Sequence, residues 1–113
     1  MTKVEAIIRP NKLEDVKAAL DALGVQGMTV THLMGSGKQR GRTQHYRGQE
    51  YVVNLLDKTK IETVVSDDQV DEIVKAITKA ASTGEIGDGK IFLSRIDDAI
   101  RIRTGESGDS ALR

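Results

Sequence analysis

The apolar residues of this 113-residue chain repeat one pattern twice, and each repeat has the order strand, helix, strand. Alternation of apolar and polar residues predicts four strands, over 3–9, 27–34, 58–65 and 91–93. Apolar residues at helical spacing predict one helix after the first strand and another after the third. Two such halves favour a ferredoxin-like βαββαβ sandwich, an α+β fold with one antiparallel sheet and two helices on one face.

The ends of the predicted elements carry further signals. Asn11 stands three residues before Glu14, and Ser66 stands three residues before Gln69, which is the spacing of a capping box. We therefore expect a side-chain cap at the start of each helix. Residues 99–102 are expected to add a short strand extension, and the tail from about 104 to 113 is expected to be mobile.

Length and composition restrict the class of protein. A chain of 113 residues is expected to form a single domain. The absence of cysteine excludes disulfides, zinc–thiolate sites and thiol chemistry. The 17 basic residues balance the 17 acidic residues, which argues against nucleic acid as the main partner. No apolar run reaches the ~20 residues of a membrane span and no signal-peptide pattern is present, so a cytoplasmic location is expected.

The sheet is expected to be covered on both faces. The first and third strands carry the apolar residues Ile7 and Val64 on the side opposite their main apolar stripe. A second layer of protein would bury these side chains. A symmetric homo-oligomer is the natural way to provide that layer.

The segment from about 36 to 57 shows no clean periodicity and is expected to be a long, flexible loop. Loops of this length are uncommon in compact domains and are usually functional or disordered. The loop is rich in glycine and arginine and holds both tyrosines of the chain. Its arginines suit phosphates or carboxylates. A merely solvated basic loop and a nucleic-acid-binding loop remain alternatives at this point.

A second glycine-rich segment, residues 83–92, joins the second predicted helix to the last strand. Gly87 and Gly89 allow backbone N–H groups to approach an anion closely, and Lys90 adds a positive charge. Arg101 and Arg103 would face one side of a strand and could converge on one polyphosphate. An ordinary turn and a solvated pair of arginines are the alternatives.

Taken together, these segments resemble the PII nitrogen-regulatory signal-transduction family over nearly the whole chain. The motifs that carry the resemblance are Ile-Ile-Arg-Pro at 7–10, Gly-Met-Thr-Val at 27–30, Gly-x-Gly-x-Gln at 35–39, Tyr-Arg-Gly-x-Glu-Tyr at 46–51, Lys-x-Lys-Ile-Glu at 58–62, Thr-Gly-x-Ile-Gly-Asp-Gly-Lys-Ile-Phe at 83–92 and Ile-Arg-Ile-Arg-Thr-Gly-Glu at 100–106. Their joint order and spacing make chance similarity improbable. The resemblance implies a homotrimer of ferredoxin-like subunits with ATP or ADP bound in the clefts between subunits.

The resemblance also implies which residues form the nucleotide site. Arg101, Arg103, Lys90 and Lys38 would contact phosphates, Thr29 and the backbone at Val64 would recognise adenine, and Ile7 would pack against it. The full set of nucleotide-binding residues that the resemblance implies is Ile7, Thr29, Gly35, Gly37, Lys38, Gln39, Glu62, Val64, Gly87, Asp88, Gly89, Lys90, Arg101 and Arg103.

The second effector implied by the resemblance is 2-oxoglutarate, bound beside Mg-ATP. Gln39 would give its side-chain oxygen to Mg²⁺, and Lys58 would pair with the 2-oxoglutarate carboxylate. The backbone at Gly37, Gly41 and Gly87 would complete the 2-oxoglutarate site.

The loop would then dock on targets, either ammonium channels or other transporters, or enzymes of nitrogen metabolism, so that contact with a membrane is only peripheral. Arg47 resembles the residue that plugs a channel, and Tyr51 matches a residue that some lineages modify. Two departures from the family pattern bear on the effectors. Lys38 stands where arginine is common, and Asp57 stands where proline is frequent, which places a negative charge beside Lys58.

The main functional alternatives are an energy sensor that responds weakly to 2-oxoglutarate and a small phosphoryl-transfer enzyme on the same fold. The sequence disfavours an enzyme, because its only histidines are His32, on an apolar strand face, and His45, in the loop. An RNA-binding sandwich is disfavoured because Phe92 is the only aromatic residue in a predicted strand.

Overall fold

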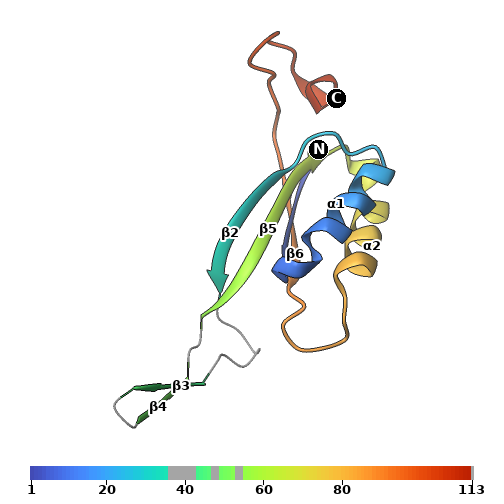
Figure 1. Cartoon of the computed structure of the whole chain (residues 1–113). Coiled ribbons are helices and arrows are strands. Elements are labelled where there is room, and N and C mark those ends of the chain that lie inside the picture. Colours follow the sequence, from blue (N-terminus) through green and yellow to red (C-terminus); the bar gives the residue numbers. More distant parts are fainter. Residues whose placement is uncertain (36–42, 47–48, 53–54, 113) are drawn as a thin grey trace.

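The computed structural model describes residues 1–35, 43–46, 49–52 and 55–112, and leaves the side chains of 43–54 undescribed. Two helices and six strands follow one another along this described part of the chain, and Figure 1 shows their arrangement. The strands are β1 (Thr2–Ile8), β2 (Thr29–Gly35), β3 (Thr43–Tyr46), β4 (Gln49–Val52), β5 (Leu56–Val65) and β6 (Lys90–Arg95). The helices are α1 (Leu13–Ala22) and α2 (Val70–Ala81), with three 3₁₀ turns η1 (Pro10–Lys12), η2 (Asp67–Gln69) and η3 (Gly108–Leu112).

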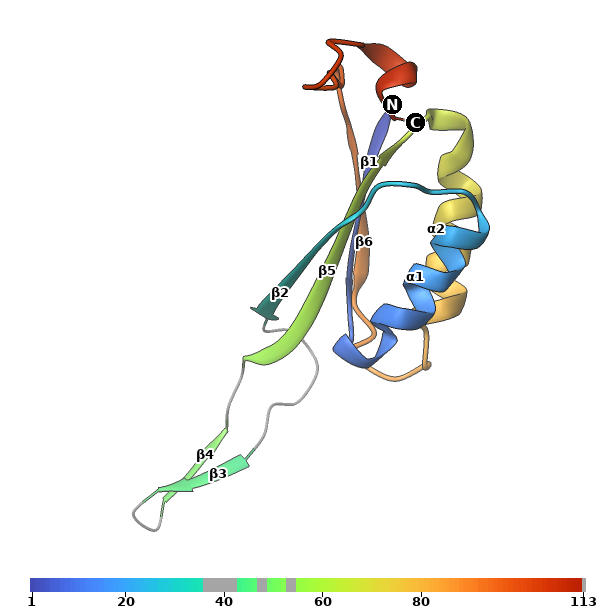
Figure 2. The same cartoon turned by 45° about the horizontal axis from the view of Figure 1, so that its top comes forward.

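Four strands form one antiparallel sheet with the order β2-β5-β1-β6. Both helices cover the same face of this sheet and leave the opposite face open, as Figure 2 shows. The predicted ferredoxin-like α+β sandwich is therefore confirmed. Among the described residues, no helix is long and apolar enough to cross a bilayer.

The core lies between the sheet and the helices, where strand alternation and helical periodicity meet. The buried positions are Val4, Ala6 and Ile8 on β1, Ile61 and Val65 on β5, Val16 and Leu20 on α1, and Ile73, Ile77 and Ala81 on α2, with Val25 beside them. Two threonines of β5 are also buried in this layer. One of them, Thr63, donates its hydroxyl to the Gly27 carbonyl at 2.6 Å. The other, Thr59, lies 3.4 Å from Nδ1 of His32, an exposed side chain on β2.

The expected capping boxes do not form, because a 3₁₀ turn precedes each helix. Asn11 lies inside η1 rather than before it, so its side chain cannot act as an N-cap. Ser66 precedes η2, and its hydroxyl contacts side-chain oxygens of Asp68 and Gln69 rather than a backbone N–H group. The expected helix positions are correct, but their expected side-chain caps are wrong.

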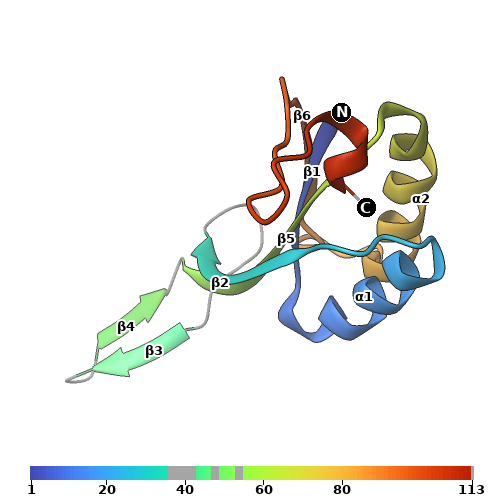
Figure 3. The same ribbon diagram turned by 90° about the horizontal axis from the view of Figure 1, so that it is seen from above.

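The segment expected to be an irregular loop contains regular structure. Strands β3 and β4 pair as a separate antiparallel sheet, with Thr43 opposite Val52, and β5 begins at Leu56. Figure 3 shows this hairpin projecting from the side of the main sheet that carries β2. The hairpin strands contain tyrosine, threonine and valine, which favour strands but are too few here to give a clear alternation. Residues 36–42, 47–48 and 53–54 lie outside the described residues.

The segment after β6 also differs from expectation. Residues 102–104 form a turn, and the only strand-like pairing is an isolated bridge between Ile100 and Ser107. The turn closes because the Gly105 N–H donates to the Arg101 carbonyl at 2.7 Å, with Gly105 at a positive φ of 74°. The tail then forms η3, which packs beside β5. The expected strand extension is therefore wrong, and the expected mobile tail carries a short helix.

Candidate functional site

The open sheet face carries charged and apolar side chains together. Ile7 on β1 pairs with Lys60 on β5 and with Lys90 on β6, so an apolar side chain lies between two cations. Further along the strands, Glu5 stands opposite Glu62. These like charges are balanced by ion pairs of 2.9 Å from Lys3 to Glu5 and from Lys60 to Glu62. Phe92 stands beside Glu5 with half of its surface exposed.

One end of the sheet, which we call the loop end, is where β1 finishes and β6 begins. The loop 83–89 lies there and is closed by the Asp88 carboxylate. Its oxygens accept hydrogen bonds from the Thr83 hydroxyl and N–H group and from the Gly84 N–H group, the last two at 2.8 and 2.9 Å. The Thr83 bonds, with help from Arg9, hold the pKa of the Asp88 carboxyl well below its ordinary value. The carboxylate is therefore ionised at neutral pH and fixes the shape of the loop.

Two cations of the neighbouring strands hold this loop from the sheet side. Arg9, just after β1, donates Nε to Asp88 at 3.1 Å and Nη2 to the Ile86 carbonyl at 2.9 Å. Lys58 on β5 donates Nζ to the Gly87 carbonyl at 2.8 Å. Burial, together with the charge of Arg9, lowers the pKa of Lys58. Both cations come from the scaffold and both reach carbonyl oxygens of the loop.

Gly89 lets the loop approach β1. Its φ is +99°, and an added Cβ would overlap the carbonyl oxygen of Ile7. A side chain is therefore excluded at this position for two separate reasons. A cavity of about 360 Å³ lies beside this contact, between β1, β6 and α2.

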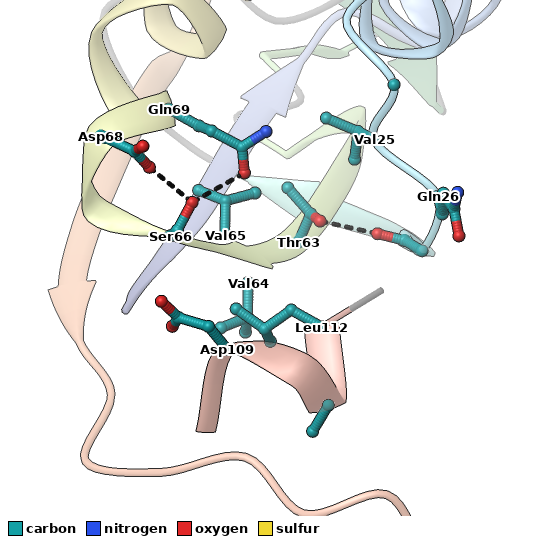
Figure 4. Close-up of a pocket in the computed structure, with 13 residues that line it drawn as sticks. Val25, Gln26, Thr63, Val64, Val65, Ser66, Asp68, Gln69, Asp109 and Leu112 are labelled. Atoms are coloured by element: carbon teal, nitrogen blue, oxygen red, sulfur yellow. Dashed lines mark hydrogen bonds between the residues drawn. The ribbon is translucent and has the colours of Figure 1, made fainter. Parts of the chain in front are cut away.

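The opposite end of the sheet, the tail end, contains a cavity of about 590 Å³. Figure 4 shows Val64 of β5 facing Leu112 of η3 across it, with Asp109 alongside. Polar lining comes from Gln26, Ser66, Asp68 and Gln69. Val64 was expected to recognise adenine, and the structure places it in this cavity wall. Thr29 lies one strand away, where it pairs with Glu62, and does not line the cavity.

Arg101 and Arg103 follow β6 beyond the tail end. The Arg101 guanidinium donates to the Ser110 carbonyl at 3.3 Å, and its backbone N–H donates to the Glu106 carbonyl at 2.8 Å. Arg103 lies exposed in the turn 102–104. The two arginines therefore do not share one face of a strand, because the turn replaces the expected extension.

Most of the expected nucleotide residues fall into two groups toward opposite ends of the chain's own sheet, and Glu62, paired with Thr29 and Glu5, lies between the groups. Ile7, Lys90 and the loop 87–89 gather at the loop end. Val64 pairs with Lys3, four residues before Ile7 and about 13 Å away along β1. The segment after β6 runs on past this end of the sheet (Figure 1). It contains Arg101, six residues after Arg95, which pairs with Thr2 at the start of β1. One chain does not bring these two groups together.

The remaining expected residues have these positions. Gly35 ends β2 at the loop end, close to Lys58. Tyr51 lies in β4, with its side chain undescribed. The residues that lie outside the described part of the chain are Gly37, Lys38, Gln39, Gly41 and Arg47.

Arg9, Thr83 and the η3 residues had no specific predicted role, although the structure places all of them at the two ends of the sheet. Arg9 and Asp88 are far apart in the sequence, and only the pairing of β1 with β6 brings them together. Arg9 lies in the motif at 7–10 and Asp88 in the motif at 83–92, which indicated a functional role for each residue but not a contact between them. Leu112 and Asp109 gave no periodic signal, because η3 is only five residues long.

Comparison with known proteins gives a consistent picture. The family model described as "Nitrogen regulatory protein P-II" matches residues 1–106. "Nitrogen regulatory protein P-II 2" of Methanothermobacter thermautotrophicus is 58% identical over 112 residues, covering 99% of this chain and 97% of that protein. "Nitrogen regulatory protein P-II" of Bradyrhizobium diazoefficiens is 57% identical, and "Nitrogen regulatory protein GlnK" of Escherichia coli K12 is 53% identical. Both alignments cover 99% of this chain and 100% of the relative.

Proposed function

Because the chain belongs to the nitrogen regulatory protein P-II family, we propose that it senses ATP or ADP together with 2-oxoglutarate and passes that signal to a partner. The coarser role is established by membership: the chain is a regulatory protein of nitrogen metabolism and not an enzyme. The resemblance inferred from the motifs is thereby confirmed. The effectors, the assembly and the partners are the proposal developed below.

The observation that carries the proposal is the separation of the two groups of nucleotide residues. Adenine recognition at Val64 and phosphate contacts at Arg101 belong to the tail end, while Ile7, Lys90 and the loop 87–89 belong to the loop end. A nucleotide needs both groups within one pocket. Two copies of the chain, with the tail end of one against the loop end of the other, supply such a pocket.

The open sheet face supports assembly into a homotrimer. Ile7 and Phe92 lie on this face together with the balanced charges of Lys3, Glu5, Lys60 and Glu62. The two helices cover only the other face. In a closed ring of three, each chain would give one of its ends to each neighbour, and three equivalent clefts would result.

The chemistry of the loop end suits a polyphosphate and a carboxylate. Lys90 and the backbone of 87–89 offer a positive charge and N–H groups to phosphates. Mg²⁺ fits as a companion of the triphosphate, because it usually takes phosphate oxygens and water with few protein ligands, here Gln39. Lys58 is partly buried, and a carboxylate of 2-oxoglutarate would offset both its desolvation and the repulsion from Arg9.

The segment 36–57 is proposed to carry the signal to an ammonium channel, another transporter or an enzyme of nitrogen metabolism. Its hairpin projects away from the sheet that would form the trimer, so it remains accessible to a partner (Figure 3). Arg47 is the proposed docking residue and Tyr51 the proposed modification site. We place the protein in the cytoplasm, where these metabolites are found. An energy sensor with a weak response to 2-oxoglutarate is the second candidate, favoured by Asp57 beside Lys58.

Isothermal titration tests the proposed effectors. Wild-type protein should bind ATP, and 2-oxoglutarate should bind when Mg-ATP is present but weakly or not at all with ADP. Lys58→Gln should abolish the 2-oxoglutarate signal, and ATP should still bind but more weakly, because the Gly87 carbonyl loses its ammonium partner. The exposed helix variant Lys75→Gln should behave as wild type. ATP binding without any 2-oxoglutarate response would select the energy-sensor alternative. Absence of ATP binding by wild type would overturn the proposal.

A further inference from the structure

The loop 83–89 is held in shape before any ligand arrives, and the contacts that hold it point to a role for Arg9. The Asp88 carboxylate closes the loop onto Thr83 and Gly84. The Glu85 N–H donates to the Thr83 hydroxyl oxygen at 3.1 Å, which adds a second local bond. Thr83 thus supports Asp88 from within the loop, and Arg9 supports it from the end of β1.

Peptide geometry relates these contacts to the orientation of the loop N–H groups. In a trans peptide the C=O and N–H bonds point in opposite directions. No cis peptide bond occurs among the described residues. Arg9 binds the Ile86 carbonyl, so the N–H of Gly87, which belongs to the same peptide unit, points away from Arg9. Lys58 binds the Gly87 carbonyl, so the N–H of Asp88 points away from Lys58.

The Arg9 side chain suits this arrangement because one planar guanidinium reaches two acceptors at once. Its side chain is 21% exposed and that of Asp88 is 24% exposed, so the ion pair is shielded from most of the solvent. The Gly89 contact with Ile7 fixes the far side of the loop. The loop is therefore anchored to the scaffold at the carbonyls of 86 and 87, at the carboxylate of 88 and at the backbone of 89.

We propose that Arg9 is a positioning residue for phosphate binding: through the Ile86 carbonyl it orients the Gly87 N–H group toward the phosphates of a nucleotide, and through the Asp88 carboxylate it holds the loop in place. This inference rests on the proposed nucleotide site and adds to it a residue that does not itself contact the ligand. Within the described part of the chain, the hydrogen bonds of the Arg9 side chain are with the loop 83–89, the proposed phosphate-binding segment, and not with the residues proposed to recognise adenine. Its loss should weaken binding of phosphate-bearing ligands and leave recognition of adenosine intact.

The test compares four single variants with wild-type protein in equilibrium binding of ATP, inorganic tripolyphosphate and adenosine. Arg9→Gln removes the charge and the planar fork, and Arg9→Lys keeps the charge without the fork. Thr83→Val removes the second support of Asp88. Lys12→Gln in η1 is the matched control, because it removes a positive charge close to Arg9 along the chain without touching the loop contacts.

The expected result is that Arg9→Gln, Arg9→Lys and Thr83→Val each weaken ATP and tripolyphosphate binding by about tenfold or more. Lys12→Gln should stay within about twofold of wild type, the range of a distant surface charge. Adenosine binding should be the same for all five proteins. Amide hydrogen exchange without ligand should become faster in 83–89 for the three loop variants alone, while thermal unfolding confirms that each variant is folded.

Three other results would contradict the positioning role of Arg9 or the proposed nucleotide site. If wild type binds ATP and Arg9→Gln binds it like Lys12→Gln, the positioning role is wrong and the proposed nucleotide site stands. If adenosine binding falls together with ATP binding, Arg9 is a general structural residue and the inference fails. If wild type binds no phosphate-bearing ligand, the proposed function fails and this inference fails with it.

Discussion

The loop end and the tail end of the sheet contribute to the same proposed site but are built in different ways. At the loop end, one carboxylate, one guanidinium and one ammonium fix the segment 83–89 through short polar contacts. At the tail end, the Arg101 guanidinium is held by the Ser110 carbonyl at 3.3 Å, and η3 borders an open cavity. If the proposed site is correct, its phosphate-binding loop is preorganised on one chain before the nucleotide arrives.

The largest effect on stability and ATP binding should come from a substitution of Gly89 at the loop end. Gly89→Ala places a Cβ at a positive φ and against the Ile7 carbonyl, so the loop must move away from β1. We expect a loss of about 1–3 kcal/mol in the free energy of unfolding together with loss of ATP binding. Chemical denaturation and isothermal titration measure these two quantities.

Gly84→Ala is the matched control for that change. Gly84 also has a positive φ, of +85°, but no atom lies within 4 Å of an added Cβ. It should therefore cost only the local backbone strain of about 1 kcal/mol and leave ATP binding largely intact. Equal effects of the two substitutions would mean that the approach of Gly89 to β1 is not what shapes the loop.

A smaller effect is expected at the tail end. Deletion of residues 108–113 removes η3, the wall facing Val64 and the carbonyl that holds Arg101. Because η3 is short and has no buried residues, the fold should lose less than about 1 kcal/mol, while ATP affinity falls severalfold. Ser110→Ala keeps the backbone carbonyl and should bind ATP as wild type does. If the deletion variant binds ATP with unchanged affinity, η3 is not part of the nucleotide site.

The smallest effect is the dependence of stability on acid. The pKa of Asp88 in the folded chain lies below its ordinary value of 3.8, so its contribution is fully present above about pH 4 and is lost as the pH falls further. Asp88→Asn should therefore be less stable than wild type at neutral pH, and the difference should shrink below about pH 4. Urea unfolding of both proteins, at neutral pH and below about pH 4, measures this difference in the free energy of unfolding.

Asp67 at the tail end is a second carboxylate whose effect on stability can be compared with that of Asp88. Its pKa is also lowered, by the Thr2 hydroxyl and the N-terminal amine, but 73% of its side chain is exposed compared with 24% for Asp88. Solvent screening weakens exposed ion pairs. Asp67→Asn should therefore change stability less than Asp88→Asn, and a larger change would contradict the view that the loop end is the more firmly held.

The main sheet and the two helices could be predicted from the sequence because the apolar residues of these elements have a clear periodicity. The alternation in 58–65 and the helical stripe of Val70, Ile73 and Ile77 gave the two-layer arrangement directly. The pairing of β3 with β4 was missed because four-residue strands give too short a pattern. The caps were missed because a 3₁₀ turn before a helix shifts its start without changing the apolar spacing.

The candidate site was predictable only in part. Glycine and lysine at 87–90 indicated an anion-binding loop, which stays a prediction, and the structure places Gly89 and Lys90 beside Ile7 in the wall of one cavity. The sequence could not indicate that Arg9 reaches Asp88, since that contact depends on β1 lying beside β6. Nor could it show that a turn at 102–104 follows Arg101 and contains Arg103, because the Gly105 contact that closes the turn has no periodic signature.

Subunit complementation tests the central claim, that each nucleotide site joins the loop end of one chain to the tail end of another. Lys90→Ala damages the loop end and Arg101→Ala damages the tail end, and neither variant alone should bind ATP. Mixed and reassembled in equal amounts, the two should regain binding at about one site in four, because random assembly pairs an intact loop end with an intact tail end that often. The double variant Lys90→Ala/Arg101→Ala mixed with either single variant should regain none. No recovery in a mixture shown by mass to contain both chains in one assembly would contradict a site shared between chains.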